Sequence, residues 1–469
     1  MPRVNLKTAL FKSSTALTET VANIKSMLKL ALSILYLGLW TASFSQNDSI
    51  TNYLKNNSST IDLLNPIFHF NEDFYTNDVF FFGFIHGSEK PQKFDLELLK
   101  DLNKHGVRHY APEVDYSLAY FFNKYLSSGD EAILDFACHQ YRIRVPQDAS
   151  VQFKNKWKNI YEYNKSLPEK DQISIIGLDK EYSKELTLTH LAYIAPENPT
   201  GVDIIDSLKF FKNLKLKEIN IISRKPVYKS GKNWEYFFGT EKTAFYKRFV
   251  SKYKKDSISL LKAFGENSND LKHLMSQSKT LNRENIIYEN FQKLCMSLTE
   301  NQEKVYLNYG YFHIQQQKVN NKMPLAGLIK KQLNINIISI VGMLSYSECL
   351  KGRKLNSTGS ISIKGTKFKG ASYNGYHSSK TWDGDHLFER VNGINRVKKI
   401  SKNDEVRLFR LDNNSSPFFN RMLFADFNRG GKKWRVEKNA VTNDYFQYIL
   451  FIKNSKSNIP LEEETTCKQ

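Results

Sequence analysis

Short apolar runs that stop at a single ionisable residue recur along this chain. The first run, at 79–85, stops at His86. Three later runs stop in the same manner at Glu113, Asp179 and His313. Continuous apolar strands are typical of the parallel sheet of an α/β protein, in which functional side chains lie at the carboxyl edge of the strands. The pattern therefore predicts that these four side chains converge.

Between the first two runs the pattern changes to a helical period. Apolar residues in 94–104 recur at helical spacing, and Gly106 stands where a glycine commonly ends a helix. The run at 107–113 then returns as a second strand. A strand, a helix and a strand in this order predict a parallel pair joined by a right-handed crossover.

The same alternation continues to about residue 350. Further strands are predicted at 173–178, 305–312 and 335–342, with a crossover helix at 324–334 before the last of them. A long, mostly helical insertion is expected at about 203–300. The predicted fold is α/β, with a mainly parallel central sheet and helices on both of its faces.

Alternating apolar and polar positions replace this pattern in the last third of the chain. They predict strands at 405–411, 432–438 and 445–453, separated by turn-forming Asn and Gly residues. We therefore expect an α/β core at 73–350 and a β-rich C-terminal portion at 351–469 that completes the fold.

The N-terminal segment has the pattern of a targeting sequence. An apolar run at 30–40 follows lysines and precedes small residues that fit cleavage before Gln46. The run is shorter than the ~20 apolar residues of a membrane span. We expect a leader and signal peptide at 1–45, a linker at 46–72, and a protein that is periplasmic or secreted. A membrane anchor formed by an uncleaved signal is the alternative.

The composition and the missing motifs argue against nucleic-acid partners, cofactors and metals. The formal net charge is +20, but the lysines are spread along the chain, often beside acids, and no nucleic-acid motif accompanies them. We expect no nucleic-acid partner. The four cysteines show no metal-ligand spacing, and the chain has no GxSxG elbow, P-loop or GxGxxG motif. No cofactor or metal is expected.

A histidine at the end of a buried strand has two interpretations. Near neutral pH, His86 could act as a general base on water, or it could only cap its strand and bond the loop. Glu113 could orient His86 or bind a substrate. It could instead be an acid at the start of the next helix, a role that fits Asp115 better.

His313 ends the strand at 305–312, and two histidines with a carboxylate also match a zinc site in ligand type. Because no closely spaced histidine pair is present, a metal site is only an alternative. Arg283 and Asn290 share one face of a predicted helix. The residues expected to bind the substrate are Ser88, Glu89, Asp115, Asp179, Arg283 and Asn290.

An ordered series of segments resembles the motifs of the erythromycin esterase-like family, part of a broader esterase and haem-uptake-like superfamily. The series covers most of 78–461, and it carries the resemblance more than any one motif does. The segments are FGFIHGS at 82–88, APEVD at 111–115, WKNIYEYN at 157–164, GLD at 177–179, RENIIYENF at 283–291, GYFHI at 310–314 and YFQYILFIKNSKSNIPL at 445–461.

The resemblance implies hydrolysis by an activated water, without a covalent nucleophile or a required metal. His86 matches the general base, Glu113 a catalytic-site carboxylate, and His313 the second histidine of the late motif. Two positions depart from the family pattern. Gly83 replaces a glutamate three residues before the first histidine, and Gly310 replaces the first histidine of the late motif.

Three functions follow from these patterns. The first is an exported, antibiotic resistance-like hydrolase that acts on an ester or related bond of a small molecule. In it, His86 is the general base, Glu113 orients or binds, and His313 polarises the substrate carbonyl. The second is a catalytically degenerate binding protein of the same fold, which Gly83 and Gly310 favour. The third is a metal-dependent hydrolase that uses His86 and His313.

Overall fold

The computed structural model describes most of the chain. The described residues are 29, 49–145, 147–212, 214, 240–276, 282–333, 335–352, 360–363, 366–369, 377–386, 389–429 and 432–461. The chain divides into two compact units, 1–56 and 57–469, and in the first of them residues 49–56 are helical. Apart from Lys29, the predicted leader and signal peptide lie outside the described residues. Within the described residues, no helix is long and apolar enough to cross a membrane.

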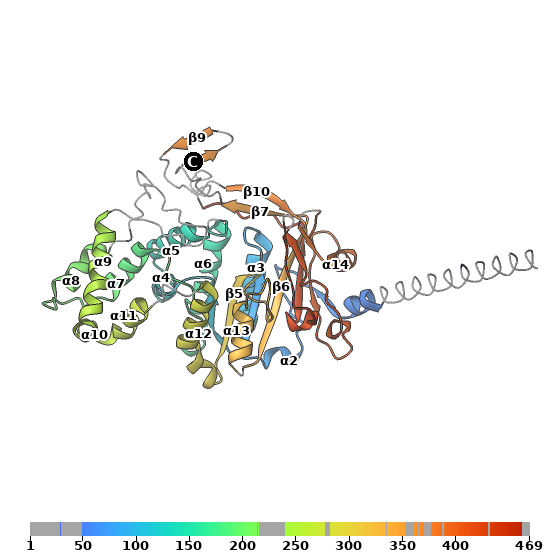
Figure 1. The fold of residues 1–469 in the computed structure, drawn as a ribbon, viewed down its shortest axis with the longest axis horizontal. Coiled ribbons are helices and arrows are strands. Elements are labelled where there is room, and N and C mark those ends of the chain that lie inside the picture. The colour runs from blue at the N-terminus through green and yellow to red at the C-terminus, as the bar shows by residue number, and fades with distance from the viewer. Residues whose placement is uncertain are drawn as a thin grey trace, which may run out of the picture. The chain divides into compact units, whose positions relative to one another are not determined.

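An eight-stranded sheet forms the centre of the second unit (Figure 1). The six neighbouring strands from β16 to β4 pair in parallel, and β13 runs antiparallel to both of its neighbours. The predicted mainly parallel sheet is therefore confirmed. In spatial order the strands are β1 (Ser58–Thr60), β13 (Val406–Arg410), β16 (Tyr448–Lys453), β6 (Ile337–Ser345), β2 (Val79–Phe84), β5 (Lys304–Gly310), β3 (Val107–Pro112) and β4 (Ser174–Ile175).

The inner strands are buried because their apolar side chains point to both faces of the sheet. All six residues of β2 are buried, as are the five central residues of β5 and the last eight of β6. Such strands need helices on both sides. Since the parallel strands end at one edge of the sheet, the loops that follow them meet there.

Helices cover both faces of the sheet, as predicted (Figure 1). Crossovers that run in opposite directions along the sheet place α3 to α6 on one face and α12 and α13 on the other. The bounds of the helices are α2 (Glu72–Tyr75), α3 (Glu89–Lys104), α4 (Tyr116–Ser128), α5 (Glu131–Arg144), α6 (Val151–Lys165), α12 (Arg283–Glu300), α13 (Leu325–Gln332) and α14 (Ile394–Ile400).

A separate group of helices, on the left of Figure 1, overlaps the insertion predicted at about 203–300. The group begins before residue 203 and leaves out α12, which packs on the sheet. Its members share an apolar cluster that includes Leu191, Phe249 and Leu271. The cluster gives the insertion a hydrophobic core of its own. The helices are α7 (Lys184–Ile194), α8 (Asp203–Asp206), α9 (Thr240–Lys255), α10 (Ser257–Phe264) and α11 (Ser268–Met275).

The C-terminal portion is rich in strands, as predicted, and extends the main sheet. The predicted strands at 405–411 and 445–453 are β13 and β16 of that sheet, whereas only Lys432–Lys433 of the run at 432–438 is a strand, β15. The remaining strands are β7 (Ser347–Gly352), β8 (Ser360–Ile363), β9 (Thr366–Lys369), β10 (His377–Trp382), β11 (Asp385–His386), β12 (Glu389–Val391) and β14 (Phe427–Arg429).

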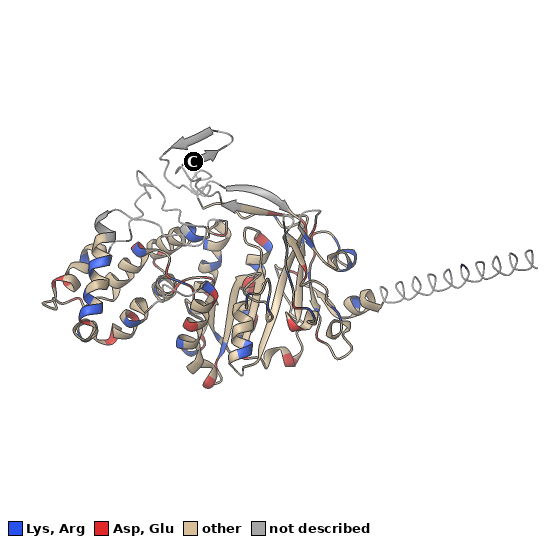
Figure 2. Cartoon of the chain, in the orientation of Figure 1, with Lys and Arg blue, Asp and Glu red and all other residues tan. Residues whose placement is uncertain are grey.

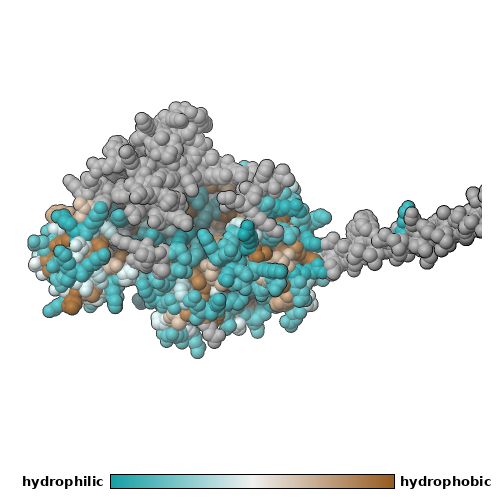
Figure 3. All heavy atoms as spheres, in the orientation of Figure 1, coloured by the Kyte–Doolittle hydropathy of each residue, from teal (hydrophilic) through white to brown (hydrophobic). Residues whose placement is uncertain are grey.

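Charged residues of both signs are interspersed over the described part of the chain. Figure 2 shows Lys and Arg alternating with Asp and Glu along the helices and around the sheet. In Figure 3 the described surface is mostly hydrophilic, with scattered hydrophobic residues. A charge distribution of this kind suits a solvated surface.

Candidate functional site

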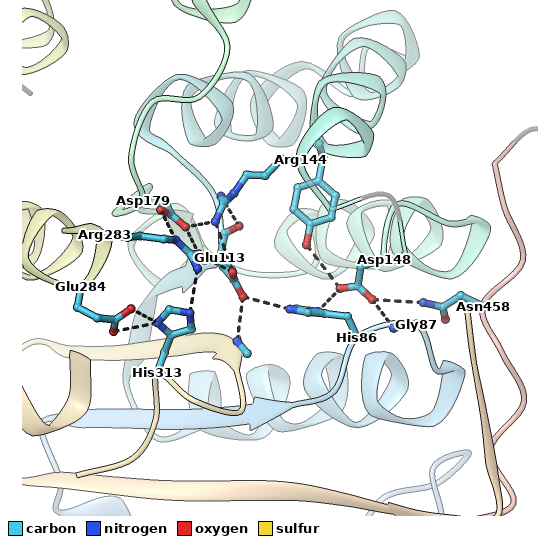
Figure 4. Close-up of polar contacts among 12 residues, drawn as sticks. His86, Gly87, Glu113, Arg144, Asp148, Asp179, Arg283, Glu284, His313 and Asn458 are labelled. Carbon is cyan, nitrogen blue, oxygen red and sulfur yellow. Dashed lines mark hydrogen bonds and ion pairs between the residues drawn. The ribbon is translucent and has the colours of Figure 1, made fainter. Parts of the chain in front are cut away.

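The carboxyl edge of the sheet brings the four strand-end residues together (Figure 4). His86 follows β2, Glu113 directly follows β3, Asp179 follows β4, and His313 follows β5. Hydrogen bonds and ion pairs connect all four through Arg283. The predicted convergence of these side chains is therefore observed.

His86 lies between two carboxylates. Its Nε2 is 3.2 Å from Oε2 of Glu113, and its Nδ1 is 3.1 Å from Oδ2 of Asp148. Burial lowers the pKa of His86, but Asp148 and Glu113 outweigh burial and raise it to about 10. In this arrangement the imidazole is protonated at neutral pH and donates from both nitrogens.

Asp148 was missed by the sequence analysis because it lies in the loop between α5 and α6 and not at the end of a strand. Its Oδ1 accepts from the backbone N of Gly87 at 3.4 Å and from Nδ2 of Asn458 at 3.3 Å. The hydroxyl of Tyr141 is 3.5 Å from Oδ2. Burial raises the pKa of Asp148, but His86 lowers it below its ordinary value, so the group is a carboxylate.

Glu113 joins His86 to the arginines of the site. Its Oε2 contacts His86 and accepts from the backbone N of Gly310 at 2.9 Å. Its Oε1 accepts from Nη2 of Arg283 at 2.5 Å and from Nη2 of Arg144 at 3.4 Å. Burial raises its pKa, but Arg283 and His86 hold it well below the ordinary value of a glutamate. Glu113 is thus an anion that joins the histidine to the arginines.

Asp179 completes a cluster of two guanidiniums and two carboxylates. Arg283 donates to it from Nε at 3.0 Å and from Nη2 at 2.5 Å, and Arg144 donates to its Oδ2. The Asp179 side chain is 0% exposed, whereas that of Arg283 is 31% exposed. The anions of the cluster are therefore buried, and the arginine that was predicted to bind substrate faces solvent.

Both ring nitrogens of His313 have partners. Nη1 of Arg283 is 3.0 Å from Nε2, and a carboxylate oxygen of Glu284 is 2.8 Å from Nδ1. Because a guanidinium only donates, Nε2 accepts and Nδ1 donates to Glu284. Glu284 also accepts from the backbone N of Leu325 at 3.0 Å, at the start of α13. Its role in fixing the ring was not visible in the sequence.

The other residues predicted to bind substrate have partners outside this cluster. Ser88 donates to Ser455, and Glu89 pairs with Lys93. Asp115 accepts from the backbone N of Leu118 and caps α4, which was the alternative role considered for it. Asn290 donates to the carbonyl of Leu178, one residue before Asp179. A substrate contact by these four residues stays a prediction.

The two glycines that depart from the family pattern have different surroundings. A Cβ at Gly83 would lie 2.4 Å from Cγ1 of Ile314, so the side chain of Ile314 already fills that position. A Cβ at Gly310 would lie 3.5 Å from Oε2 of Glu113 and 3.5 Å from Nε2 of His86. Gly310 therefore borders the reactive groups, whereas Gly83 belongs to the packed interior.

The site has no arrangement typical of a metal centre. Among the described residues, no group of three or more His, Cys, Asp or Glu side chains could hold a metal ion. Each ring nitrogen of His86 and His313 is occupied by a protein partner instead. The side chains present are suited to proton transfer and to hydrogen bonding of an oxygen.

Comparison with known proteins identifies the fold. No protein-family model and no curated protein matches the chain. A solved structure from Bacillus cereus is 12% identical, with a TM-score of 0.57, over 88% of this chain and 99% of that one. A succinoglycan biosynthesis protein is 14% identical, with a TM-score of 0.53, over 88% and 99% of the two chains.

A mutant of the erythromycin esterase EreC in its open conformation is also similar. It is 12% identical, with a TM-score of 0.53, over 85% of this chain and 98% of that one. The chain therefore has the erythromycin esterase-like fold that its ordered motifs predicted. At this level of identity the similarity concerns the fold.

Proposed function

We propose that this protein, which has the erythromycin esterase-like fold, is a hydrolase that cleaves an ester or related bond of a small molecule. The carrying observation is His86, held between two carboxylates at the carboxyl edge of the sheet and connected through Glu113 to Arg283. A proton-transfer group beside a cationic donor is the minimum that hydrolysis by water needs.

His86 is the proton-transfer residue of this proposal. In the resting arrangement both carboxylates keep the imidazole protonated. A water or substrate that displaces Glu113 from Nε2 removes one of these two carboxylates, while burial continues to lower the pKa. The ring can then release its Nε2 proton to solvent water and act as the general base predicted from the sequence.

Arg283 is suited to hold the substrate carbonyl because it is charged and its side chain is partly exposed. His313 and Glu284 lie behind it, so His313 would act on the carbonyl through Arg283. In the reaction, Nε2 of His86 accepts a proton from water as the water oxygen bonds to the carbonyl carbon. The oxyanion forms beside Arg283, the bond to the leaving alcohol breaks, and the alcohol takes the proton from Nε2.

Turnover of ester and lactone substrates by the purified protein tests this proposal. His86→Ala should lower kcat/KM by about 10²- to 10⁴-fold. His109→Ala is a matched control, because His109 also bonds two partners, Ser174 and Glu303, but at the opposite edge of the sheet. Turnover that is equal in wild type and His86→Ala would contradict the mechanism.

A ligand-binding protein without turnover is the second candidate. The favouring observation is that both ring nitrogens of His86 face carboxylates, those of Asp148 and Glu113, which suits a fixed donor better than a base. Retention of an ester ligand without hydrolysis, and unchanged affinity in Glu113→Gln, would support this function over the hydrolase.

Export through the N-terminal signal is part of the same proposal. N-terminal sequencing of the protein from the periplasm or the medium should give a chain that starts at Gln46. A protein that retains residues 1–45 in the membrane fraction would support the anchor instead.

A further inference from the structure

The chain that leaves β16 returns across the edge of the sheet to the loop of His86. At the end of β6, the backbone N of Asn454 donates to the carbonyl of Ser345 at 3.1 Å. At the end of β2, the backbone N of Asn458 donates to the carbonyl of Gly87 at 2.9 Å. We call residues 454–460 the C-terminal clamp.

The clamp is bonded to the loop of His86 by more than this contact. The backbone N of Glu89 donates to the carbonyl of Lys456 at 2.9 Å, and Oγ of Ser88 donates to Oγ of Ser455 at 2.7 Å. Ser88 is 0% exposed and Ser455 is 2% exposed. Buried hydrogen bonds of this kind fix the backbone beside His86.

The same clamp is bonded to the start of α6, which directly follows the loop that carries Asp148. The backbone N of Val151 donates to the carbonyl of Ile459 at 2.9 Å, and the backbone N of Ile459 donates to Oε1 of Gln152 at 2.9 Å. Between these contacts, Nδ2 of Asn458 reaches Oδ1 of Asp148 (Figure 4). Asn458 thus bonds one loop through its backbone and the other through its side chain.

We propose that the C-terminal clamp positions the His86–Asp148 pair, with Asn458 as its positioning residue. Asp148 then supplies the orienting carboxylate that Gly83 cannot supply, since Ile314 fills the space beside Gly83. This inference rests on the proposed function, in which His86 transfers the proton.

The chemistry of Asn458 fits this role. A carboxylate that orients an imidazole must present one oxygen to Nδ1 while its other oxygen is held. Asn458 and Gly87 hold Oδ1 of Asp148, which leaves Oδ2 facing His86. Asn458 is 2% exposed, and its own Oδ1 has no partner among the described residues. A flipped amide would place this Oδ1 against Oδ1 of Asp148, and two acceptors repel each other.

Charged and titratable groups surround this pair from several elements. Asp148 and Glu113 contact His86 directly, and the remaining groups act on these two carboxylates. The groups that face Asp148 are Lys156 and Tyr141, and those that face Glu113 are Arg144, Arg283 and His313.

Asn458→Leu in the full chain tests the clamp, because it keeps the backbone bonds and the approximate shape but removes the donor. We expect kcat on an ester substrate to fall about tenfold with KM changed less than about twofold. In NMR spectra of labelled histidine, the titration midpoint of His86 should fall by about one pH unit. Asp148→Asn should lower the midpoint further.

Asn439→Ala is the control, since Asn439 is an exposed asparagine of the C-terminal portion outside the clamp. Asn458→Ala is the second variant if the leucine does not fold. A His86 midpoint and a kcat equal to those of Asn439→Ala would overturn the clamp. If the midpoint falls as expected but even wild type hydrolyses no ester, the clamp stands and the hydrolase proposal fails.

Discussion

His86 in the sheet edge and His190 in the helical insertion are both surrounded by protein, yet their acid–base properties diverge. Burial lowers the pKa of both rings. At His86, Asp148 and Glu113 reverse this effect and raise the pKa to about 10. Among the described residues no carboxylate raises the pKa of His190, and burial with the nearby His273 lowers it to about 3.

The surroundings of His190 explain the difference. Its Nδ1 is 3.1 Å from the hydroxyl of Ser117, its Nε2 has no partner among the described residues, and its ring stacks on Tyr120 at 4.1 Å. Aromatic rings and a hydroxyl stabilise a neutral imidazole, whereas paired anions stabilise an imidazolium. The position of carboxylates, more than depth of burial, therefore separates a candidate functional histidine from a packed one.

The largest effect is expected from removing one of the two carboxylates that contact His86. Glu113→Gln should lower ester turnover by about 10³-fold, because Arg283 loses the carboxylate that holds its guanidinium at the place of the substrate carbonyl. The loss of a buried pairing partner should also reduce the free energy of unfolding by roughly 3–5 kcal/mol. Kinetics and urea unfolding measure the two effects.

Glu303→Gln provides the control for this change, since Glu303 is a 40% exposed partner of His109. It should leave turnover unchanged and alter stability by less than about 1 kcal/mol. A titration midpoint of His86 that does not fall in Glu113→Gln would remove the electrostatic basis of the comparison.

Acid pH should destabilise the insertion around His190, whereas alkaline pH should destabilise the sheet edge around His86. His190 and His273 have pKa values lowered to about 3 and about 4, so their stabilising contributions are present above 6.5 and are lost as pH falls toward these values. The pKa of His86 is raised from 6.5 to about 10, so its contribution is present below 6.5 and is lost as pH rises to about 10. Each histidine contributes at most about 1.4 kcal/mol per pH unit.

Urea unfolding between pH 4 and pH 10 measures this dependence. The loss of unfolding free energy at acid pH should be smaller in the double variant His190→Phe, His273→Phe. The loss at alkaline pH should be smaller in Asp148→Asn. An acid side that is unchanged in the double variant would assign acid sensitivity to carboxylates elsewhere.

Gly310→Ala sharpens the comparison by changing the space beside His86 without changing its anions. The new methyl group fits at 3.5 Å from Glu113 and His86, so the fold should be retained. Turnover should fall about tenfold because the methyl group occupies space next to Nε2. The His86 midpoint should stay within about half a pH unit.

Gly83→Ala is the counterpart of this variant. Its Cβ would meet Ile314 at 2.4 Å, so it should destabilise the protein by about 1–3 kcal/mol. Equal stability losses in Gly83→Ala and Gly310→Ala would show that both glycines serve packing alone.

The smallest effect is expected from His190→Phe at pH 7.5. The phenyl ring can keep the stack on Tyr120 and removes a nitrogen that has no partner, at the expense of the bond to Ser117. The free energy of unfolding should change by less than about 1 kcal/mol. A loss above about 2 kcal/mol would mean that the neutral imidazole bonds a group, such as a buried water, that stabilises the insertion.

The sequence predicted what local pattern encodes. β2, β3 and β5 lie within two residues of their predicted ranges, because continuous apolar runs bounded by turns are a local signal. The run at 173–178 gave only the two-residue β4, although the backbone N atoms of Ile176 and Asp179 still donate to the carbonyls of Tyr110 and Val114 beside it. Convergence of the strand ends followed from parallel topology alone.

The residues that bond these strand-end side chains could not be predicted from the sequence. Arg144 ends α5, Asp148 lies in the next loop, and Glu284 is the second residue of α12, so none of them interrupts an apolar run. Their contacts depend on how the helices pack on the sheet. The role of Asn458 was even harder to predict, because its bond to Asp148 joins residues 310 positions apart. A polar residue that matters through packing carries no periodic signal.

The position of β16 between β13 and β6 has a consequence for synthesis of the chain. The strand that the ribosome makes near the end lies inside the sheet, two places from β2, which is made near the beginning. A nascent chain therefore lacks an internal strand and leaves the edge of β6 unpaired until Tyr448–Lys453 emerge. Long-range pairing of this kind slows folding, and during that interval the exposed strand edge is open to chaperones and to aggregation.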